Sequence, residues 1–234
     1  MNGGARMNGG TRAGLLKALQ HGDSQFPSGG FAFSQGLEAS SQLADRLGGF
    51  DFAGFVEAQI RHRWAKADRV ALLRAYWLGG DIDLLADLDR EVEAATFIEG
   101  LRTGSRRNGV ALLTTHARMG TPGAVAYRSM VQQGRACGHL AVVQGLLWCA
   151  LGLDEESVVT MSGYQAVASL VTAAVRLGIV GAIEAQTAIT TALGIVAEVS
   201  DDLVVDDQPL RSFTPMAEIA VALHGTSGQR LFSN

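Results

Sequence analysis

The 234-residue chain has little of what most catalytic and nucleotide-binding proteins need. Its only cysteines are Cys137 and Cys149, and its only lysines are Lys17 and Lys66. Two cysteines in a chain of this length do not make a disulfide framework. The phosphate-binding GxxxxGK[ST] loop is absent, and neither lysine follows a glycine. The sequence therefore argues against a disulfide-rich protein and against a P-loop nucleotidase.

Aromatic residues, excess charge and long apolar runs are also scarce. Aromatics make up 6% of the chain, while alanine, leucine and glycine are abundant, which favours closely packed helices over a β-sandwich. The net charge of −4 gives no electrostatic basis for nucleic-acid binding. Every long apolar stretch is interrupted by Gly, Gln, Arg or Thr, and the glycine-rich N-terminus lacks a secretion signal. We expect a cytoplasmic protein with neither a membrane nor a nucleic acid as partner.

Apolar residues recur at helical spacing between glycine and proline breaks. Asp51, Asp81 or Asp83, and Asp154 stand where helices should begin, and Pro215 suits the first turn of a last helix. No alternating strand pattern or internal repeat is evident. The pattern predicts an all-α protein: a single-domain helical bundle of about ten helices over residues 14–223. Residues 1–13 should form a disordered N-terminal segment, and residues 224–234 a flexible, partner-binding C-terminal tail.

The helix expected after Asp81 shows an apolar stripe and a charged face. Leucines 84, 85 and 88 with Val92 form the stripe, and the acids and Arg90 between them form the face. This pattern predicts that Asp89 and Glu93 face solvent. It also predicts that the helix pauses around residues 100–104, where two glycines occur.

The stretch least typical of a helix is FPSGGFAFSQGLE, residues 26–38. Pro27 restricts its own backbone and that of Phe26, whereas Gly29 and Gly30 permit positive φ. We predict a rigid structural bend at Pro27, Gly29 and Gly30 that opens into a helix from about Ser34. Two interpretations remain open: a buried turn between helices, or a preformed surface on which another protein docks.

Three candidate sites for chemistry are weak. Cys137 and His139 form a C-x-H pair whose thiolate and imidazole suit nickel or zinc, but no partner pair stands at usable spacing. Ser34 lies in an Ala-Phe-Ser-Gln-Gly sequence similar to a nucleophile elbow, although no strand precedes it. Buried small residues and a helix start explain these features more simply. We expect no catalytic residue, metal or cofactor, and keep a nickel-binding metal carrier and a serine hydrolase as alternatives.

The third candidate is a basic patch at Arg102, Arg106 and Arg107. A solvated helix face partly paired with Glu99 is the simpler interpretation of these arginines.

The C-terminal sequence GTSGQRLFSN carries large apolar residues, Leu231 and Phe232, in a tail with no evident core of its own. Apolar residues in such a tail usually have a surface to bind. Ordering a flexible tail costs entropy, so binding requires that both apolar anchors be buried. The tail therefore predicts docking on a partner protein.

Three separated stretches together resemble the F-type urease accessory proteins, the UreF family. They are DSQFPSGGFAFSQGLE (23–38), AAVRLGIVGAIEAQ (173–186) and TPMAEIAVALHGTSGQRLF (214–232). Weaker similarity covers residues 105–113 and 138–145. The chain departs from the family pattern at Ile179-Val180, at Gly225, and at Phe232-Ser233, where the family often has an arginine before the serine.

The resemblance implies an all-helical, dimeric protein that performs no catalysis of its own. Proteins of this family bind the D/H-type urease accessory protein, recruit the G-type nickel GTPase and dock on apo-urease. Carried over to matching positions, the resemblance implies that Glu38, Arg176 and His224 line or gate the partner surface. It also implies that the tail residues Arg230, Leu231, Phe232 and Ser233 become ordered on the D/H-type partner.

Overall fold

The computed structural model describes residues 9–23, 25–28, 35–45 and 48–224, and these residues form helices without any strand. Twelve helical segments are described, and three of them, α3, η2 and α4, form one continuous helix, so the described residues make ten helices. The all-α prediction is confirmed. The segments are α1 (Gly9–Gly22), α2 (Leu37–Asp45), α3 (Phe52–Gln59), the π-helical segment η2 (Ile60–Asp68), α4 (Arg69–Leu78), α5 (Ile82–Ala95), α6 (Glu99–Met119), α7 (Ala124–Gln132), α8 (Leu140–Ala150), α9 (Glu155–Arg176), α10 (Ala182–Ser200) and α11 (Pro215–His224).

Aspartate caps start three helices where the sequence predicted them. The carboxylates of Asp51, Asp81 and Asp154 accept the backbone N–H groups three residues later at 2.9, 3.2 and 2.8 Å. Each cap satisfies a donor that the helix itself leaves unpaired. The N–H of Ser157 also lowers the pKa of the Asp154 carboxyl, because it stabilises the charged form.

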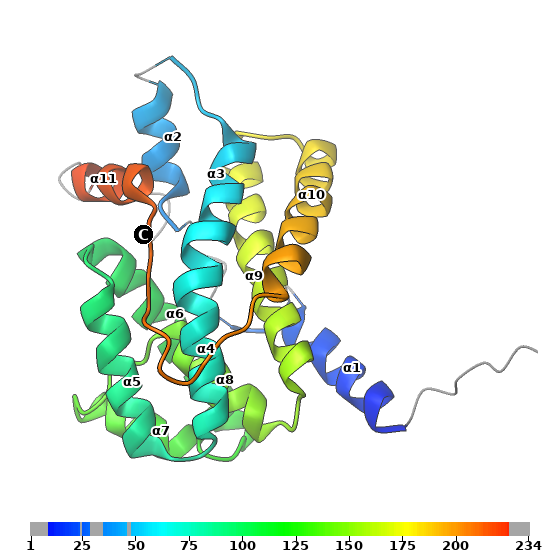
Figure 1. Cartoon of the computed structure of the whole chain (residues 1–234), viewed down its shortest axis with the longest axis vertical. Helices are drawn as coiled ribbons and strands as arrows, with labels where there is room; N and C mark the ends of the chain where they lie inside the picture. The colour runs from blue at the N-terminus through cyan, green and yellow to red at the C-terminus, as the bar shows by residue number, and fades with distance from the viewer. Residues whose placement is uncertain (1–8, 24, 29–34, 46–47, 225–234) are drawn as a thin grey trace, which may run out of the picture.

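The longest helix runs from α3 through η2 into α4 and crosses the whole molecule (Figure 1). The sequence predicted its continuation past Asp68, but not the π-helical turns. Arg69, the first residue of α4, is buried and donates to the carbonyl oxygens of Ser200 and Asp202 at 3.0 and 3.1 Å. These bonds fix the end of α10 to the middle of the long helix.

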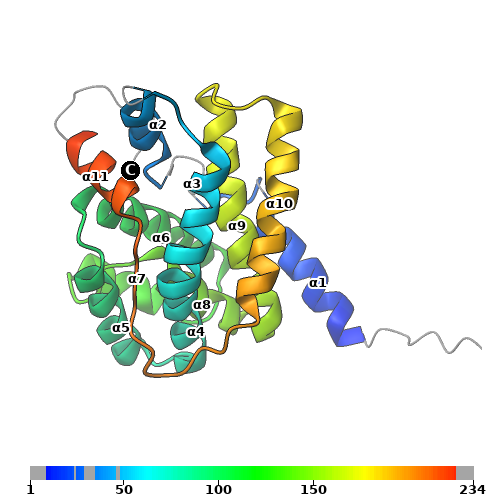
Figure 2. The same ribbon diagram turned by 45° about the horizontal axis from the view of Figure 1, so that its top comes forward.

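Two large apolar clusters make up most of the core, and the long helix contributes to both; a third, small cluster joins α2, α6 and α11. One is formed mainly by α4, α5, α6, α7 and α8, and the other by α3, η2, α9 and α10. Figure 2 shows α5, α6 and α7 on one side of the long helix and α9 and α10 on the other. Gly145 of α8 permits a close approach to α4, because a Cβ atom there would lie 2.5 Å from the carbonyl oxygen of Leu72 and 2.6 Å from the Cβ of Ala75.

Several predicted boundaries differ from the structure. The helix α5 ends at Ala95 and α6 begins at Glu99, so the break precedes residues 100–104, where the pause was predicted. Gly100 and Gly104 lie inside α6, where tertiary packing outweighs their low helix propensity. The first helix begins at Gly9, within the segment predicted to be disordered. Residues 1–8 and the tail 225–234 lie outside the described residues.

Two helices, α9 and α10, are long and apolar enough to cross a membrane by length and composition alone. Of the apolar window in each, 56% is buried within the protein for α9 and 22% for α10. Helix α9 is a core helix, because it packs against α1, α2, α4, η2 and α10. On α10, the hydroxyls of Thr187, Thr190 and Thr191 donate to carbonyl oxygens one turn earlier in the helix.

Candidate functional site: the corner of α2 and α11, and a buried polar cluster

The C-terminal part of the bend motif builds a corner where α2 and α11 pack together (Figure 1). Gly36 has φ +86°, and a Cβ atom there would lie 2.9 Å from Cγ2 of Val221. Glycine is therefore required both for the backbone conformation and for the approach of α11. Glu38, in the first turn of α2, is 1% exposed and so lies beneath this corner rather than on its surface.

Helix α11 buries one side and exposes an apolar side. Ala217, Ala220 and Val221 face inward, whereas Met216, Ile219 and Leu223 are exposed to 61, 51 and 58%. The exposed residues recur at spacings of three and four, so they form one stripe along the helix. We call these three residues the α11 stripe. It points away from the core, and the chain leaves α11 directly into the tail.

The remaining residues predicted for partner binding are placed only in part. Arg176 is exposed and ends α9, where a cation complements the helix dipole. His224 ends α11, but its side chain lies outside the described residues, as do Arg230, Leu231, Phe232 and Ser233. The roles of all these residues therefore stay predictions.

The bend is described on its N-terminal side. Backbone bonds from Phe26 to Asp23 and from Ser28 to Phe26 tighten it, and the carbonyl oxygen of Pro27 accepts the hydroxyl of Thr115 on α6 at 2.7 Å. The ring of Phe26 packs against His21 and His116. Gly29, Gly30 and Ser34 lie outside the described residues, so the rest of the predicted bend and the serine-hydrolase alternative are not placed.

A cavity of about 350 Å³ lies beside the bend. The bend, η2, α6, α8 and α9 contribute its walls. Its lining mixes residues with amide and hydroxyl groups and apolar residues, and includes Asp23 and the ion pair of Arg63 with Asp68. Trp64 and Ser162 close one side through a hydrogen bond of 3.0 Å.

The predicted basic patch is mostly a set of ion pairs. Arg102 and Arg106 contact Glu99 at 2.6 and 2.8 Å, and both also approach the carboxylate of Glu93. The paired interpretation of these arginines is therefore confirmed, and the contacts with Glu99 lower the pKa of its carboxyl.

A buried polar cluster connects α5 to the turn before α8. Asp89 is 0% exposed, and its carboxylate accepts the hydroxyl of Tyr127 and the backbone N–H groups of residues 137, 138 and 139. Burial, and then the charge of Asp89, raise the pKa of Tyr127. The prediction that Asp89 faces solvent is wrong, because this turn supplies the donors that a buried carboxylate requires.

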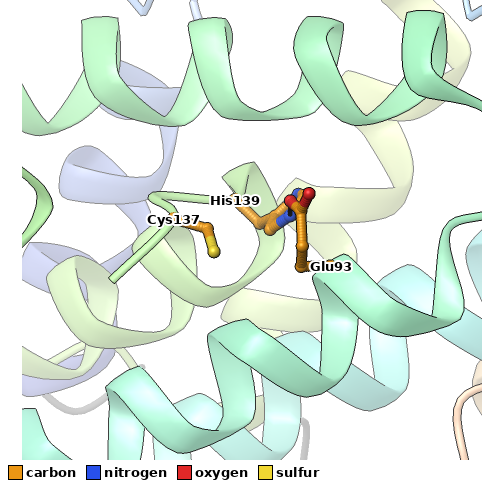
Figure 3. A group of neighbouring side chains, drawn as sticks. All are labelled: Glu93, Cys137 and His139. Carbon is orange, nitrogen blue, oxygen red and sulfur yellow. Dashed lines mark hydrogen bonds and ion pairs between the residues drawn. The ribbon is translucent and has the colours of Figure 1, made fainter. Parts of the chain in front are cut away.

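The same turn brings together a possible set of metal ligands (Figure 3). One donor atom each from Glu93, Cys137 and His139 lie within 4.8 Å of one another. His139 is 0% exposed, and its Nε2 atom lies 2.7 Å from Glu93. Cys149 is not a member of this cluster. The C-x-H pair was visible in the sequence, but Glu93 was missed because a lone acid on a charged helix face carries no signal.

The fold and these sites together define an all-helical protein that presents an apolar helix face and buries its polar clusters. Comparison with known proteins identifies the family to which this all-helical protein belongs. The UreF family model matches residues 50–193. The chain is 32% identical to the urease accessory protein UreF of Kocuria rhizophila, with 94% of this chain and 97% of that one covered.

Two further relatives support the same assignment. The UreF proteins of Trichodesmium erythraeum and Jannaschia sp. are each 30% identical, over 94% and 99% of this chain and 96% and 99% of theirs. The chain belongs to the UreF family of urease accessory proteins. The family resemblance of its sequence is thus confirmed, and its role lies in urease maturation.

Proposed function

We propose that this protein is a non-enzymatic, cytoplasmic scaffold that bridges the D/H-type urease accessory protein and the G-type nickel GTPase. The assembly then docks on apo-urease for nickel insertion. The observation that supports this proposal most is the α11 stripe, which continues directly into a tail with two further large apolar residues. No nucleotide-binding loop accompanies it in the sequence.

The physical argument concerns exposed apolar surface. A contiguous apolar stripe on a soluble protein marks a surface that a partner covers. An exposed apolar helix face followed in the sequence by further large apolar residues offers two connected binding elements. Because Leu231 and Phe232 follow Leu223 by eight and nine residues, one partner surface can cover both the stripe and the anchors. We assign that surface to the D/H-type partner.

The other predicted positions have different parts in this scheme. Glu38 is buried, so we propose that it fixes the corner on which α11 rests rather than contacting a partner itself. Arg176 is exposed at the end of α9, and we assign it to the surface that a second partner contacts. His224 joins α11 to the tail. We expect the functional unit to be a homodimer, as the resemblance implies.

Truncation after Gly228 tests the proposal. We expect the truncated chain to lose capture of the D/H-type protein, read by pull-down and by size-exclusion chromatography with light scattering. The substitution Ile219→Ser on the α11 stripe should weaken capture in the full-length chain. Its matched control is Val125→Ser on α7, a residue 65% exposed and outside the stripe.

Unchanged capture by both the truncated chain and Ile219→Ser would overturn the role of α11 and the tail. Equal weakening by Val125→Ser would show that any exposed apolar residue matters and that the stripe has no special part. The same chromatography, run on the chain alone, tests the expected homodimer.

A further inference from the structure

The cluster of Glu93, Cys137 and His139 has properties that a purely structural ion pair does not need. Glu93 comes from α5, and the other two residues come from the turn between α7 and α8. Their donor atoms are a carboxylate oxygen, a thiol sulfur and an imidazole nitrogen, all within 4.8 Å of one another. Mixed nitrogen, sulfur and oxygen donors suit borderline divalent ions. We propose that these three residues bind one divalent transition-metal ion of the Zn²⁺, Co²⁺ or Ni²⁺ class.

The turn that carries two of the ligands is rigid. The carboxylate of Asp89 accepts three successive backbone N–H groups, from Cys137 at 2.8 Å, Gly138 at 2.5 Å and His139 at 3.0 Å. Asp89 therefore fixes the turn from beneath, near the N-terminus of α8, where a negative charge is favourable. Ligands on a fixed backbone lose little conformational entropy when they bind an ion.

Gly109 of α6 closes the other side of this turn. A Cβ atom at Gly109 would overlap the carbonyl oxygen of Gly138, so α6 contacts the turn backbone directly. Gly138 itself has φ +81°, a conformation that glycine adopts without strain. The alternation Cys-Gly-His thus lets both ligand side chains leave a compact turn.

The imidazole of His139 is oriented as metal-bound histidines usually are. Its Nε2 atom faces Glu93 at 2.7 Å, and its Nδ1 atom lies 3.1 Å from Oγ of Ser105. A partner on the second ring nitrogen fixes the ring and its tautomer. Ser105 also accepts the backbone N–H of Leu140, so its own position is fixed.

Ion binding requires two proton movements and no oxidant or reductant. Without an ion, Nε2 of His139 lies 2.7 Å from Oε2 of Glu93, within hydrogen-bond distance. In the ion-bound state Nε2 carries no proton and binds the ion, while the single ring proton resides on Nδ1, exchanged through solvent, and is donated to Oγ of Ser105. The Cys137 thiol releases its proton to solvent, and nitrogen, thiolate and carboxylate then bind the ion.

The surroundings provide access and limit affinity. A cavity of about 360 Å³ reaches Cys137, and the ion pairs Asp83–Arg135 and Asp87–Arg90 line it. Three protein ligands would leave one further coordination position of the ion for water. Arg102 and Arg106 approach the other carboxylate oxygen of Glu93 at 3.5 and 3.2 Å, so part of its charge is already neutralised. We therefore expect an exchangeable ion rather than a permanently held one.

Titration of the purified full-length protein with Co²⁺ tests this site. We expect saturation at one ion per chain, with a thiolate-to-cobalt charge-transfer band in the near ultraviolet. Cys137→Ser should abolish the band, and His139→Gln should weaken binding. The matched control is Cys149→Ser, which removes the other cysteine and should leave the band unchanged.

Calorimetry with Zn²⁺ and Ni²⁺ gives a second measurement. Ser105→Ala removes only the orienting hydroxyl and should weaken affinity about tenfold. Thermal melting by circular dichroism identifies any variant that fails to fold, and Cys137→Ser is the decisive one because it is conservative. Absence of saturable binding, or equal binding by wild type and Cys137→Ser, would overturn the proposal. Partner capture is measured separately, so the scaffold function stands or fails independently.

Discussion

Two fully buried histidines, His139 and His116, lie in different environments. His139 has a carboxylate at Nε2 and a hydroxyl at Nδ1. His116 has a hydroxyl, Thr121, 2.9 Å from Nδ1, but its Nε2 atom has no hydrogen-bond partner among the described residues. Its ring lies against His21 and Phe26, with centroids 5.1 and 5.5 Å away.

The difference shows how environment decides what a buried imidazole can do. Burial, and then the proximity of His21, lower the pKa of His116 to about 4, so this ring is neutral and packs as an aromatic. Beside His139, the carboxylate of Glu93 offers a hydrogen-bond partner and a ligand for a cation. One histidine therefore belongs to the packing beneath the bend, and the other to a polar site.

The largest expected effect follows from removing the support of the His139 site. Asp89→Ala leaves three backbone donors and the Tyr127 hydroxyl without their acceptor, and should lower the free energy of unfolding by roughly 4 kcal/mol. Urea denaturation followed by circular dichroism measures it. Asp87→Ala, on the exposed side of the same helix, is the control. A loss no larger than that of the control would contradict the structural role of Asp89.

Acid should affect the His116 site next. The folded-state pKa of about 4 lies below the ordinary value of 6.5, so protons bind the unfolded chain more tightly. His116 therefore contributes about 3 kcal/mol to the free energy of unfolding above pH 6.5, and this contribution is lost as the pH falls toward 4. Burial, and then the charge of Lys17, also lower the pKa of His21, so His21 changes the stability in the same direction.

His116→Asn isolates this contribution. Urea denaturation between pH 4 and pH 8 should show a smaller pH-dependent loss in the variant than in the wild type. His62→Asn, a substitution at an exposed histidine, is the control. An identical pH dependence in wild type and His116→Asn would disprove the assignment.

Gly109→Ala tests the contact between α6 and the turn that carries His139. The new methyl group would overlap the backbone of Gly138, so we expect a loss of about 2 kcal/mol despite the better helix propensity of alanine. Gly194→Ala on α10 is the matched control, because a Cβ atom there meets nothing within 4 Å. Thermal unfolding of both variants measures the difference. A Gly109 variant as stable as the Gly194 variant would mean that α6 and the turn are not in contact.

The smallest effect concerns the connection between the bend and α6. Thr115→Val keeps the side-chain shape but removes the hydrogen bond to the carbonyl oxygen of Pro27, and should cost about 0.5–1 kcal/mol. Proteolysis near residue 27 should become faster, because the bend loses its attachment to α6. An unchanged cleavage rate would show that other contacts alone hold the bend.

Much of the fold could be predicted because its signals are local. Asp51, Asp81 and Asp154 cap helices only a few residues away, and Pro215 starts the last helix at its first turn. The break between α5 and α6 was misplaced because two glycines were taken as stops, although α6 packs tightly enough to include them. The candidate site was predicted less well. The C-x-H pair was evident, but its carboxylate partner was not.

The sequence by itself determined the helical class, most helix starts and the apolar character of the C-terminal helix, because each depends on residues within a few turns of one another. Only the tertiary structure decided that Asp89 is buried, because its donors come from a turn up to 50 residues away. It likewise placed Glu93 beside His139, 46 residues further along the chain. A helix periodicity shows which residues share a face, but a neighbouring backbone decides whether a charge on that face meets water or buried N–H groups.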